Sequence, residues 1–305
     1  MMSMMNKGGK EMNNATDKIK KMMNAVKNGQ YTTDDGSLRL KLSEITASEA
    51  RVFLPGDLKT INNELNSFHR LVESGVCYVE CENTDAFSLA KKYVDESGAI
   101  PDDPKVLVLN AANPVMPGGG VRRGETESEE ILCRQSTLLL SLESKDAWKY
   151  YDYNRRTYND WGSDTMIVSP YVEVFKDCQN EFVDDTFVVS VLSCAAPMLF
   201  WGINDVQVKD YYDLVYQRMI SMLNCAATLG YEYLVLGAWG CDAYYNDAVD
   251  ISTLFHRAIR GFNYYGNGAG SVFRKIGFAV LDRSRDMYNY KAFSRLFSGH
   301  LEVMR

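Results

Sequence analysis

One stretch of the chain, Asn110 to Glu130, constrains both its fold and its chemistry; it reads N-A-A-N-P-V-M-P-G-G-G-V-R-R-G-E-T-E-S-E-E. The run Val106 to Leu109 before it is continuously apolar, which is typical of a buried strand. A helical pattern follows, from about Thr126 to Leu142. Glycines between a strand and a helix leave backbone N–H groups free to turn toward an anion, and the positive helix end would face the same place. The stretch therefore predicts a site for a phosphate-bearing ligand at the carboxyl end of a strand.

The two best-known glycine loops that bind phosphate do not fit this stretch. A P-loop fails at Glu125, which stands where that loop needs a lysine. A dinucleotide-binding fingerprint fails at Arg123, which stands in place of its third glycine. A different kind of glycine loop is therefore indicated.

The stretch resembles a macrodomain, a family that carries an N-A-A-N element followed by G-G-G-V. Here these elements are Asn110 to Asn113 and Gly118 to Val121. The bacterial-type poly(ADP-ribose) glycohydrolase branch of that family follows its glycine triplet with Gln-Glu-Glu. This chain keeps the two glutamates, Glu129 and Glu130, and has Ser128 in the glutamine position.

A second loop of the same branch reads roughly Gly-Ala-x-Gly-Cys-Gly-x-Phe-x-Asn and is similar to Gly237 to Asn246. Asp242 replaces a glycine of that pattern and Tyr244 replaces its phenylalanine. The resemblance extends loosely from about Gln30 to Phe297, while its specific motifs cover about 30 residues in these two places.

The resemblance implies a three-layer α/β/α macrodomain with a mixed central sheet and an N-terminal helical extension. Strands that alternate with helices agree with an α/β sheet covered on both faces. We expect residues 1–15 to be a flexible tail and residues 16–305 to be a single macrodomain-like glycohydrolase domain. Expected helices cover residues 17–27, 57–74, 84–95, 126–142, 208–229 and 290–297, with another after 247, and expected strands cover 38–42, 77–81, 106–109, 166–175, 186–194, 233–236 and 273–281.

The resemblance also implies ADP-ribose as the recognised unit. Its pyrophosphate would lie against the two glycine loops, Asn113 and Glu129 would hydrogen-bond the hydroxyls of the distal ribose, and Tyr244 would press on that ribose. The residues expected to bind substrate are Asn113, Gly118, Gly119, Gly120, Val121, Gly237, Gly240, Cys241, Asp242, Ala243, Tyr244 and Asn246.

The implied reaction is hydrolysis of the ribose O-glycosidic bonds of poly(ADP-ribose), which releases ADP-ribose. Such a bond breaks through an oxocarbenium-like state, and its leaving oxygen needs a proton. Glu130 would be that acid and would then activate water, while Glu129 would hold the substrate. Two alternatives stay open: a hydrolase that removes single ADP-ribose units, and a macrodomain that binds ADP-ribose without catalysis.

Plainer roles are open for the same side chains. Thr126 and Glu129 have the spacing of a helix capping box, in which Glu129 would only bond the Thr126 backbone. Glu130 could be a solvated surface glutamate, and Asn113 a turn residue before Pro114. Each of these alternatives predicts a different burial and a different set of hydrogen bonds.

Composition narrows the partners. A net charge of −7 and a pI near 5.2 argue against a general nucleic-acid coat, which needs a broad basic surface, and we expect no direct sequence-specific nucleic-acid binding. No apolar run reaches membrane-spanning length. Seven cysteines without C-x-x-C spacing and three distant histidines favour reduced thiols and no metal site. We therefore expect a cytoplasmic monomer that needs no cofactor and acts on ADP-ribose polymer or ADP-ribosylated protein.

Overall fold

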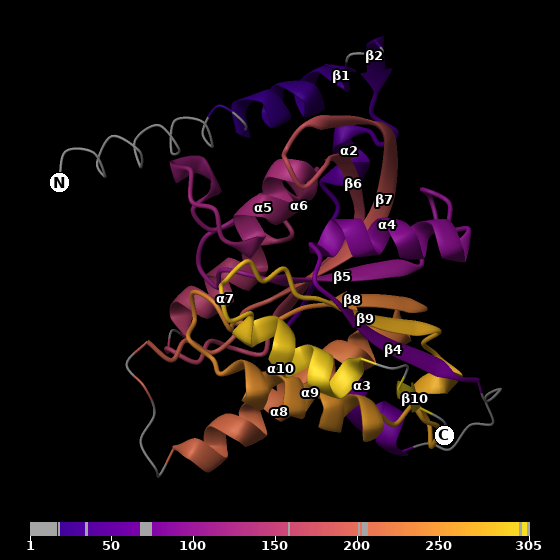
Figure 1. Cartoon of the computed structure of the whole chain (residues 1–305). Coiled ribbons are helices and arrows are strands. Elements are labelled where there is room, and N and C mark those ends of the chain that lie inside the picture. The colour runs from indigo at the N-terminus through magenta and orange to yellow at the C-terminus, as the bar shows by residue number, and fades with distance from the viewer. Residues whose placement is uncertain are drawn as a thin grey trace.

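The computed structural model describes residues 17, 19–33, 36–67, 75–157, 159–200, 202, 207–298 and 301–303, and its centre is an eight-stranded mixed sheet (Figure 1). The order across the sheet is β10-β4-β9-β8-β5-β7-β6-β3. From β4 to β7 neighbouring strands are parallel, while β10, β6 and β3 pair antiparallel with their neighbours. The strands are β3 (Arg51–Phe53), β4 (Cys77–Glu82), β5 (Val106–Ala111), β6 (Met166–Lys176), β7 (Phe182–Cys194), β8 (Tyr233–Leu236), β9 (Lys275–Ala279) and β10 (Leu301–Val303).

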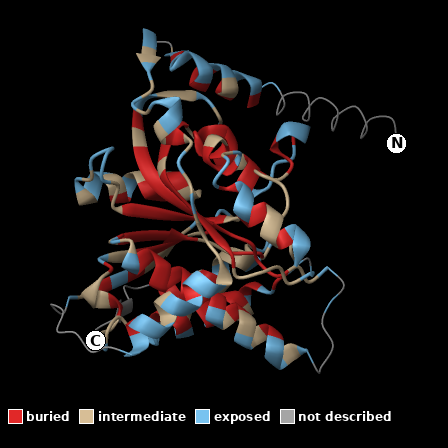
Figure 2. Ribbon diagram, turned by 180° about the vertical axis from the view of Figure 1, so that it is seen from behind, coloured by how far each residue is buried: buried red, intermediate tan, exposed pale blue. Residues whose placement is uncertain are grey.

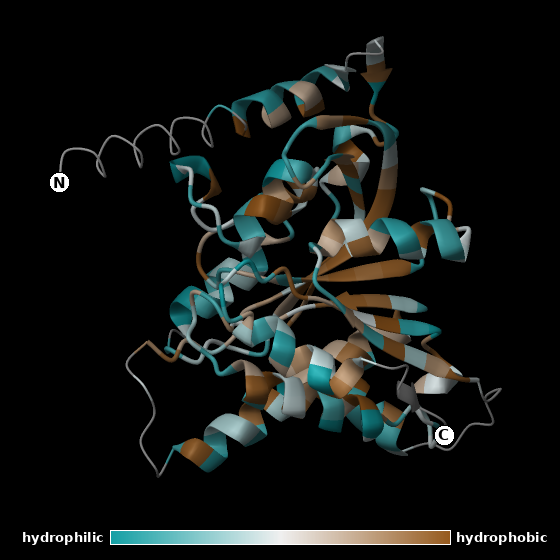
Figure 3. Ribbon diagram, in the orientation of Figure 1, coloured by the Kyte–Doolittle hydropathy of each residue, from teal (hydrophilic) through white to brown (hydrophobic). Residues whose placement is uncertain are grey.

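Helices cover both faces of this sheet, which confirms the three-layer α/β/α architecture (Figure 1). The alternation along β5 shows why both faces need cover: Leu107 and Leu109 pack with one core, Val106 and Val108 with the other. In Figure 2 the strands at the centre of the sheet are mostly buried, and in Figure 3 they form an apolar band between the helices. One layer contains α3 (Pro55–Ser67), α8 (Val208–Thr228), α9 (Ala248–Arg260) and α10 (Tyr288–Phe297), and the other contains α4 (Ala86–Ser97), α5 (Ser128–Gln135), α6 (Leu138–Leu142) and α7 (Trp148–Arg156).

The helix predicted over residues 126–142 is wrong as a single element, because it consists of two helices with a break between α5 and α6. Ser136 is extended, with φ −147° and ψ 179°, and forms an isolated bridge with Val174 of β6. Thr137 then exchanges hydrogen bonds with Glu173: its N–H donates to the Glu173 carbonyl, and its hydroxyl accepts from the Glu173 N–H. The backbone at this break therefore forms its hydrogen bonds with strand β6 and not within a continuous helix.

The N-terminal extension packs onto the layer that contains α4 to α7. Residues 19–28 are helical, and the hairpin of β1 (Gln30–Thr33) and β2 (Gly36–Arg39) follows in place of the single strand expected over 38–42. Both carboxylate oxygens of the buried Glu173 accept from the chain after this hairpin, one from the Lys41 N–H and one from the Leu42 N–H, each at 2.9 Å. Glu173 thus ties the extension to β6.

Other boundaries differ by a few residues from the expected ones. The short helix α2 (Glu44–Ala47) and the edge strands β3 and β10 were not predicted, because three or four residues carry too little periodicity. The expected tail, residues 1–15, and residues 68–74 of the helix expected over 57–74 lie outside the described residues. Within the described part, every helix is too short or too polar to cross a bilayer.

Glu173→Ala should lower the free energy of unfolding by about 2 kcal/mol or more, since it leaves two N–H groups without acceptors at roughly 1–3 kcal/mol each. Urea unfolding followed by circular dichroism measures this. Glu64→Ala, at an exposed position of α3, is the matched control and should change the free energy by less than about 0.5 kcal/mol. Equal stability of the two variants would contradict the anchoring role of Glu173.

Candidate functional site

Two adjoining cavities lie at the carboxyl ends of β5 and β8, where the sequence predicts the ligand site. The smaller has a volume of about 150 Å³ and contains the carboxyl groups of Glu129 and Glu130 in its wall. The larger, of about 270 Å³, extends along the sheet edge toward β9 and α10. Both are bordered by the same five residues, Ala111, Glu127, Ser128, Ala238 and Asp242. The two cavities therefore form one elongated site.

The first glycine loop turns tightly, with Gly118 and Gly119 at φ +64° and +57°, a region that disfavours other residues. Its N–H groups have acceptors inside the protein. Gly118 donates to the Glu129 carboxylate, Gly119 to the Met116 carbonyl, Gly120 to Glu130 Oε1 at 2.7 Å, and Val121 to the Gly118 carbonyl. In this structure the loop folds around the two glutamates and directs these donors to the interior, and the pyrophosphate contact expected for them stays a prediction. Gly118, Gly119, Gly120 and Val121 consequently lie outside both cavity walls.

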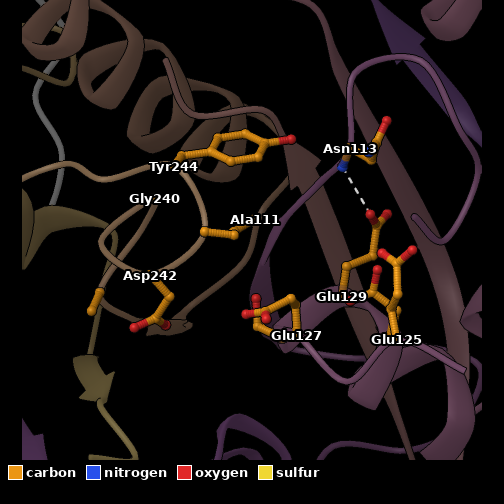
Figure 4. A pocket seen from close by; sticks show the side chains of 12 residues that line it. Ala111, Asn113, Glu125, Glu127, Glu129, Gly240, Asp242 and Tyr244 are labelled. Atoms are coloured by element: carbon orange, nitrogen blue, oxygen red, sulfur yellow. Dashed lines mark hydrogen bonds between the residues drawn. The ribbon is translucent and has the colours of Figure 1, made fainter. Parts of the chain in front are cut away.

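Glu129 is 3% exposed and accepts hydrogen bonds on both carboxylate oxygens. Asn110 Nδ2 donates to Oε1 at 3.3 Å, and the Asn113 N–H donates to Oε2 at 2.8 Å (Figure 4). Burial raises the pKa of Glu129 to about 8, although these donors and the Gly118 N–H act in the opposite direction. Glu127 rather than Thr126 precedes the first turn of α5, so the capping-box alternative for Glu129 is wrong.

Glu130 is 4% exposed, which rules out the solvated surface role. Its Oε1 accepts from Gly120, and its buried Oε2 has no hydrogen-bond partner among the described residues. A Cβ atom on Gly119 would lie 2.3 Å from Glu130 Oε1 and 3.2 Å from Glu129 Oε2, so only glycine leaves room for both carboxyl groups. One turn later Arg134 is also buried; burial lowers the pKa of its guanidinium, and the Glu130 charge opposes that shift.

Asn113 and Tyr244 stand at the same end of the smaller cavity, away from Glu127 and Asp242 (Figure 4). Asn113 Oδ1 accepts from the N–H groups of Val115 and Met116, so this residue does make a turn. Its Nδ2 donates to none of the described residues and stays available at the cavity. The turn and a ligand contact are therefore compatible.

The second glycine loop offers the donors that the first one lacks. In the described part of the chain, the N–H groups of Gly240, Asp242 and Ala243 donate to no protein acceptor. Asn246 is buried away from the cavities, where its amide donates to the carbonyls of Pro197 and Gly240 at 2.8 Å each. In this structure its amide holds the second glycine loop, and the expected ligand contact stays a prediction.

Of the two remaining expected residues, one lies in a cavity wall and the other does not. Gly237 borders the larger cavity, while Cys241 borders neither, and its N–H donates to the Ala238 carbonyl at 3.0 Å. Sequence reasoning missed Ala111, Glu127, Ser128 and Ala238 as lining residues. A signal existed for these four, since Ala111 lies within the Asn110 to Asn113 element, Ala238 follows Gly237, and Glu127 and Ser128 lie in the first turn of the predicted helix.

The site is acidic. Glu125, Glu127 and Asp242 join the two buried glutamates around the smaller cavity. Burial, followed by the charge of Asp242, raises the pKa of Glu127, and burial followed by the charge of Asp282 raises that of Asp242. A group of three His, Cys, Asp or Glu side chains able to hold a metal ion is found nowhere in the described ranges.

Comparison with known proteins points to one family. A family model described as the catalytic domain of microbial-type PARG matches residues 20–177. Among solved structures, poly(ADP-ribose) glycohydrolase (PARG) from Thermomonospora curvata is 25% identical and has a TM-score of 0.82, over 93% of this chain and 100% of that one. The same enzyme bound to the inhibitor ADP-HPD gives 25% identity and a TM-score of 0.78, over 93% and 99% of the two chains.

A second relative has been solved with a nucleotide ligand. Poly(ADP-ribose) glycohydrolase from Deinococcus radiodurans, in complex with ADP-ribose, is 27% identical and has a TM-score of 0.72, over 85% of this chain and 98% of that one. No curated protein sequence matches the chain.

Glu129 should make stability depend on pH. Because its folded pKa is about 8 and its unfolded value is 4.5, the folded protein binds a proton more tightly, so this contribution to stability is complete below pH 4.5 and is lost as pH rises to about 8. The slope is on the order of 1 kcal/mol per pH unit in that window. Urea unfolding from pH 5 to pH 9 should show a smaller decline for Glu129→Gln than for wild type. Parallel curves would contradict the raised pKa.

Proposed function

Because the chain belongs to the microbial-type poly(ADP-ribose) glycohydrolase family, we propose that it hydrolyses the ribose O-glycosidic bonds of poly(ADP-ribose) and releases ADP-ribose. The observation that carries this proposal is the carboxyl group of Glu130. One of its oxygens accepts a hydrogen bond from the Gly120 N–H, the other is buried with no partner among the described residues, and Glu130 lines the smaller cavity. A macrodomain that only binds ADP-ribose has no need of such an acid.

The elongated site accommodates ADP-ribose in one direction. The distal ribose occupies the smaller cavity between Asn113 and Tyr244, and the adenosine extends into the larger one. The pyrophosphate then lies near the residues that border both cavities. There it meets the free N–H groups of the second glycine loop and the first turn of α5, which bind negative charge without any lysine or arginine.

Glu130 is the general acid in this proposal. It gives a proton to the leaving ribose oxygen as the C–O bond breaks, and its carboxylate then takes a proton from the water that attacks the anomeric carbon. Burial raises the pKa of Glu129 to about 8, so the Glu129 carboxyl group keeps a proton at neutral pH. Glu129 holds the loop and the substrate, and Tyr244 limits how the ribose can turn.

Glu130→Gln should test this assignment, because the amide keeps the shape of the side chain but cannot deliver a proton. We expect ADP-ribose to bind wild type with a Kd in the micromolar range, about −8 kcal/mol, and Glu130→Gln within a few-fold of it. Release of ADP-ribose from the polymer should fall about 10²-fold or more. Glu129→Gln should lose binding and turnover together.

Calorimetry with ADP-ribose and a polymer-cleavage assay give both readouts. A parallel assay on protein that carries single ADP-ribose units separates this function from mono-ADP-ribosyl hydrolysis. Near-wild-type turnover by Glu130→Gln would overturn the catalytic role, and binding without cleavage by wild type would leave a non-catalytic ADP-ribose-binding macrodomain.

Catalysis in this proposal needs no metal, because the proton and the water can both be handled by Glu130. We expect turnover to be unchanged after dialysis against EDTA, with and without added Mg²⁺ or Zn²⁺. Loss in EDTA and recovery with either ion would show that a metal takes part.

A further inference from the structure

Arg155, on α7, connects that helix to the loop after Asn113. Its Nη2 donates to the Val115 carbonyl at 2.6 Å, and its guanidinium lies 4.5 Å from the centre of the Trp148 ring. Both side chains are exposed, Trp148 by 50%. A cation and an indole are therefore held together at the surface. Val115, to which Arg155 donates, lies two residues after Asn113 of the cavity wall.

Arg155 differs from the arginines around it in its charge balance. Arg122 pairs with Glu143 and Arg123 with Glu125, each at 2.7 Å, and Arg156 pairs with Asp152 at 3.0 Å. Arg155 has no carboxylate within ion-pair distance among the described residues. Arg155 lines neither cavity, so its guanidinium is positive charge that remains available to an anion outside a site bordered by five carboxyl groups.

The position of Arg155 and Trp148 relative to the scissile bond follows from the direction in which ADP-ribose lies across the two cavities. The cavity that would receive adenosine joins the smaller cavity at Glu127 and Asp242. The leaving side of the ribose must therefore open at the other end, beside Asn113 and Tyr244 (Figure 4). Arg155 holds Val115, which follows Asn113 in the loop at that end.

We propose that Arg155 and Trp148 bind the ADP-ribose unit on the leaving side of the bond, and so favour polymer over a single ADP-ribose group. This inference rests on the proposed glycohydrolase function. In the polymer the leaving oxygen belongs to the next unit, which carries its own adenine and pyrophosphate. Arginine recognises phosphate oxygens, and the exposed indole provides a surface on which a base stacks.

The test compares Arg155→Gln with Arg156→Gln, a neighbouring arginine whose charge is already paired with Asp152. Arg155→Gln should raise KM for poly(ADP-ribose) about three- to tenfold, with kcat and the calorimetric Kd for ADP-ribose unchanged. Its KM should also rise less steeply with NaCl than that of wild type, because one phosphate contact is lost. Trp148→Leu should raise KM in the same way, and Arg156→Gln should match wild type.

Two results would overturn the inference while the glycohydrolase function stands. KM for polymer could be the same in Arg155→Gln and wild type. Alternatively, Arg155→Gln could weaken ADP-ribose binding as much as it raises KM, which would mean that Arg155 only supports the Val115 loop. Failure of wild type to release ADP-ribose from the polymer is a separate result, and it would overturn the proposed function itself.

Discussion

The burial of two adjacent carboxyl groups against a glycine loop is the constraint on which this site depends. Glu129 and Glu130 together accept hydrogen bonds from the backbone N–H groups of Asn113, Gly118 and Gly120. Removing a carboxyl group from water is costly unless donors surround it, so the loop must bring its N–H groups inward. A side chain at Gly119 would occupy the space of both carboxyl groups. The glycines are therefore needed first for the acids, and only through them for a ligand.

This arrangement divides the work between the two loops at the sheet edge. The first loop, after β5, positions the acids, and Asn110 at the end of that strand links Glu129 to Ser193 of β7. The second loop, after β8, keeps free N–H groups because Asn246 and internal turns hold its shape from behind. Parallel strands place both loops at one edge, since their carboxyl ends coincide. The fold thus places two buried carboxyl groups and a loop with free backbone N–H groups at one edge of the sheet.

The helix α8, with its long periodic pattern, and the continuously apolar strands β5 and β8 lie within one or two residues of their expected bounds. The sequence could not predict the break at Ser136, because that break depends on hydrogen bonds to Glu173, 37 positions later in the chain. The glutamate pair was found from its neighbours in sequence, but the direction of the Gly118 to Val121 donors was not. A glycine N–H faces inward when a buried acceptor lies within hydrogen-bond distance. The local sequence does not show where that acceptor will lie.

Acidity around the site affects how tightly a product could bind. A pyrophosphate placed beside Glu127 and Asp242 meets like charge, and the raised pKa of each side chain shows that burial already disfavours its ionised form. Backbone donors must therefore outweigh this repulsion, which limits affinity for free ADP-ribose. Contacts outside the cavities, such as those proposed for Arg155 and Trp148, act on the polymer alone and are lost once the bond is cleaved. Under the proposed function, binding energy would then favour the substrate over the released product, which is the direction that turnover requires.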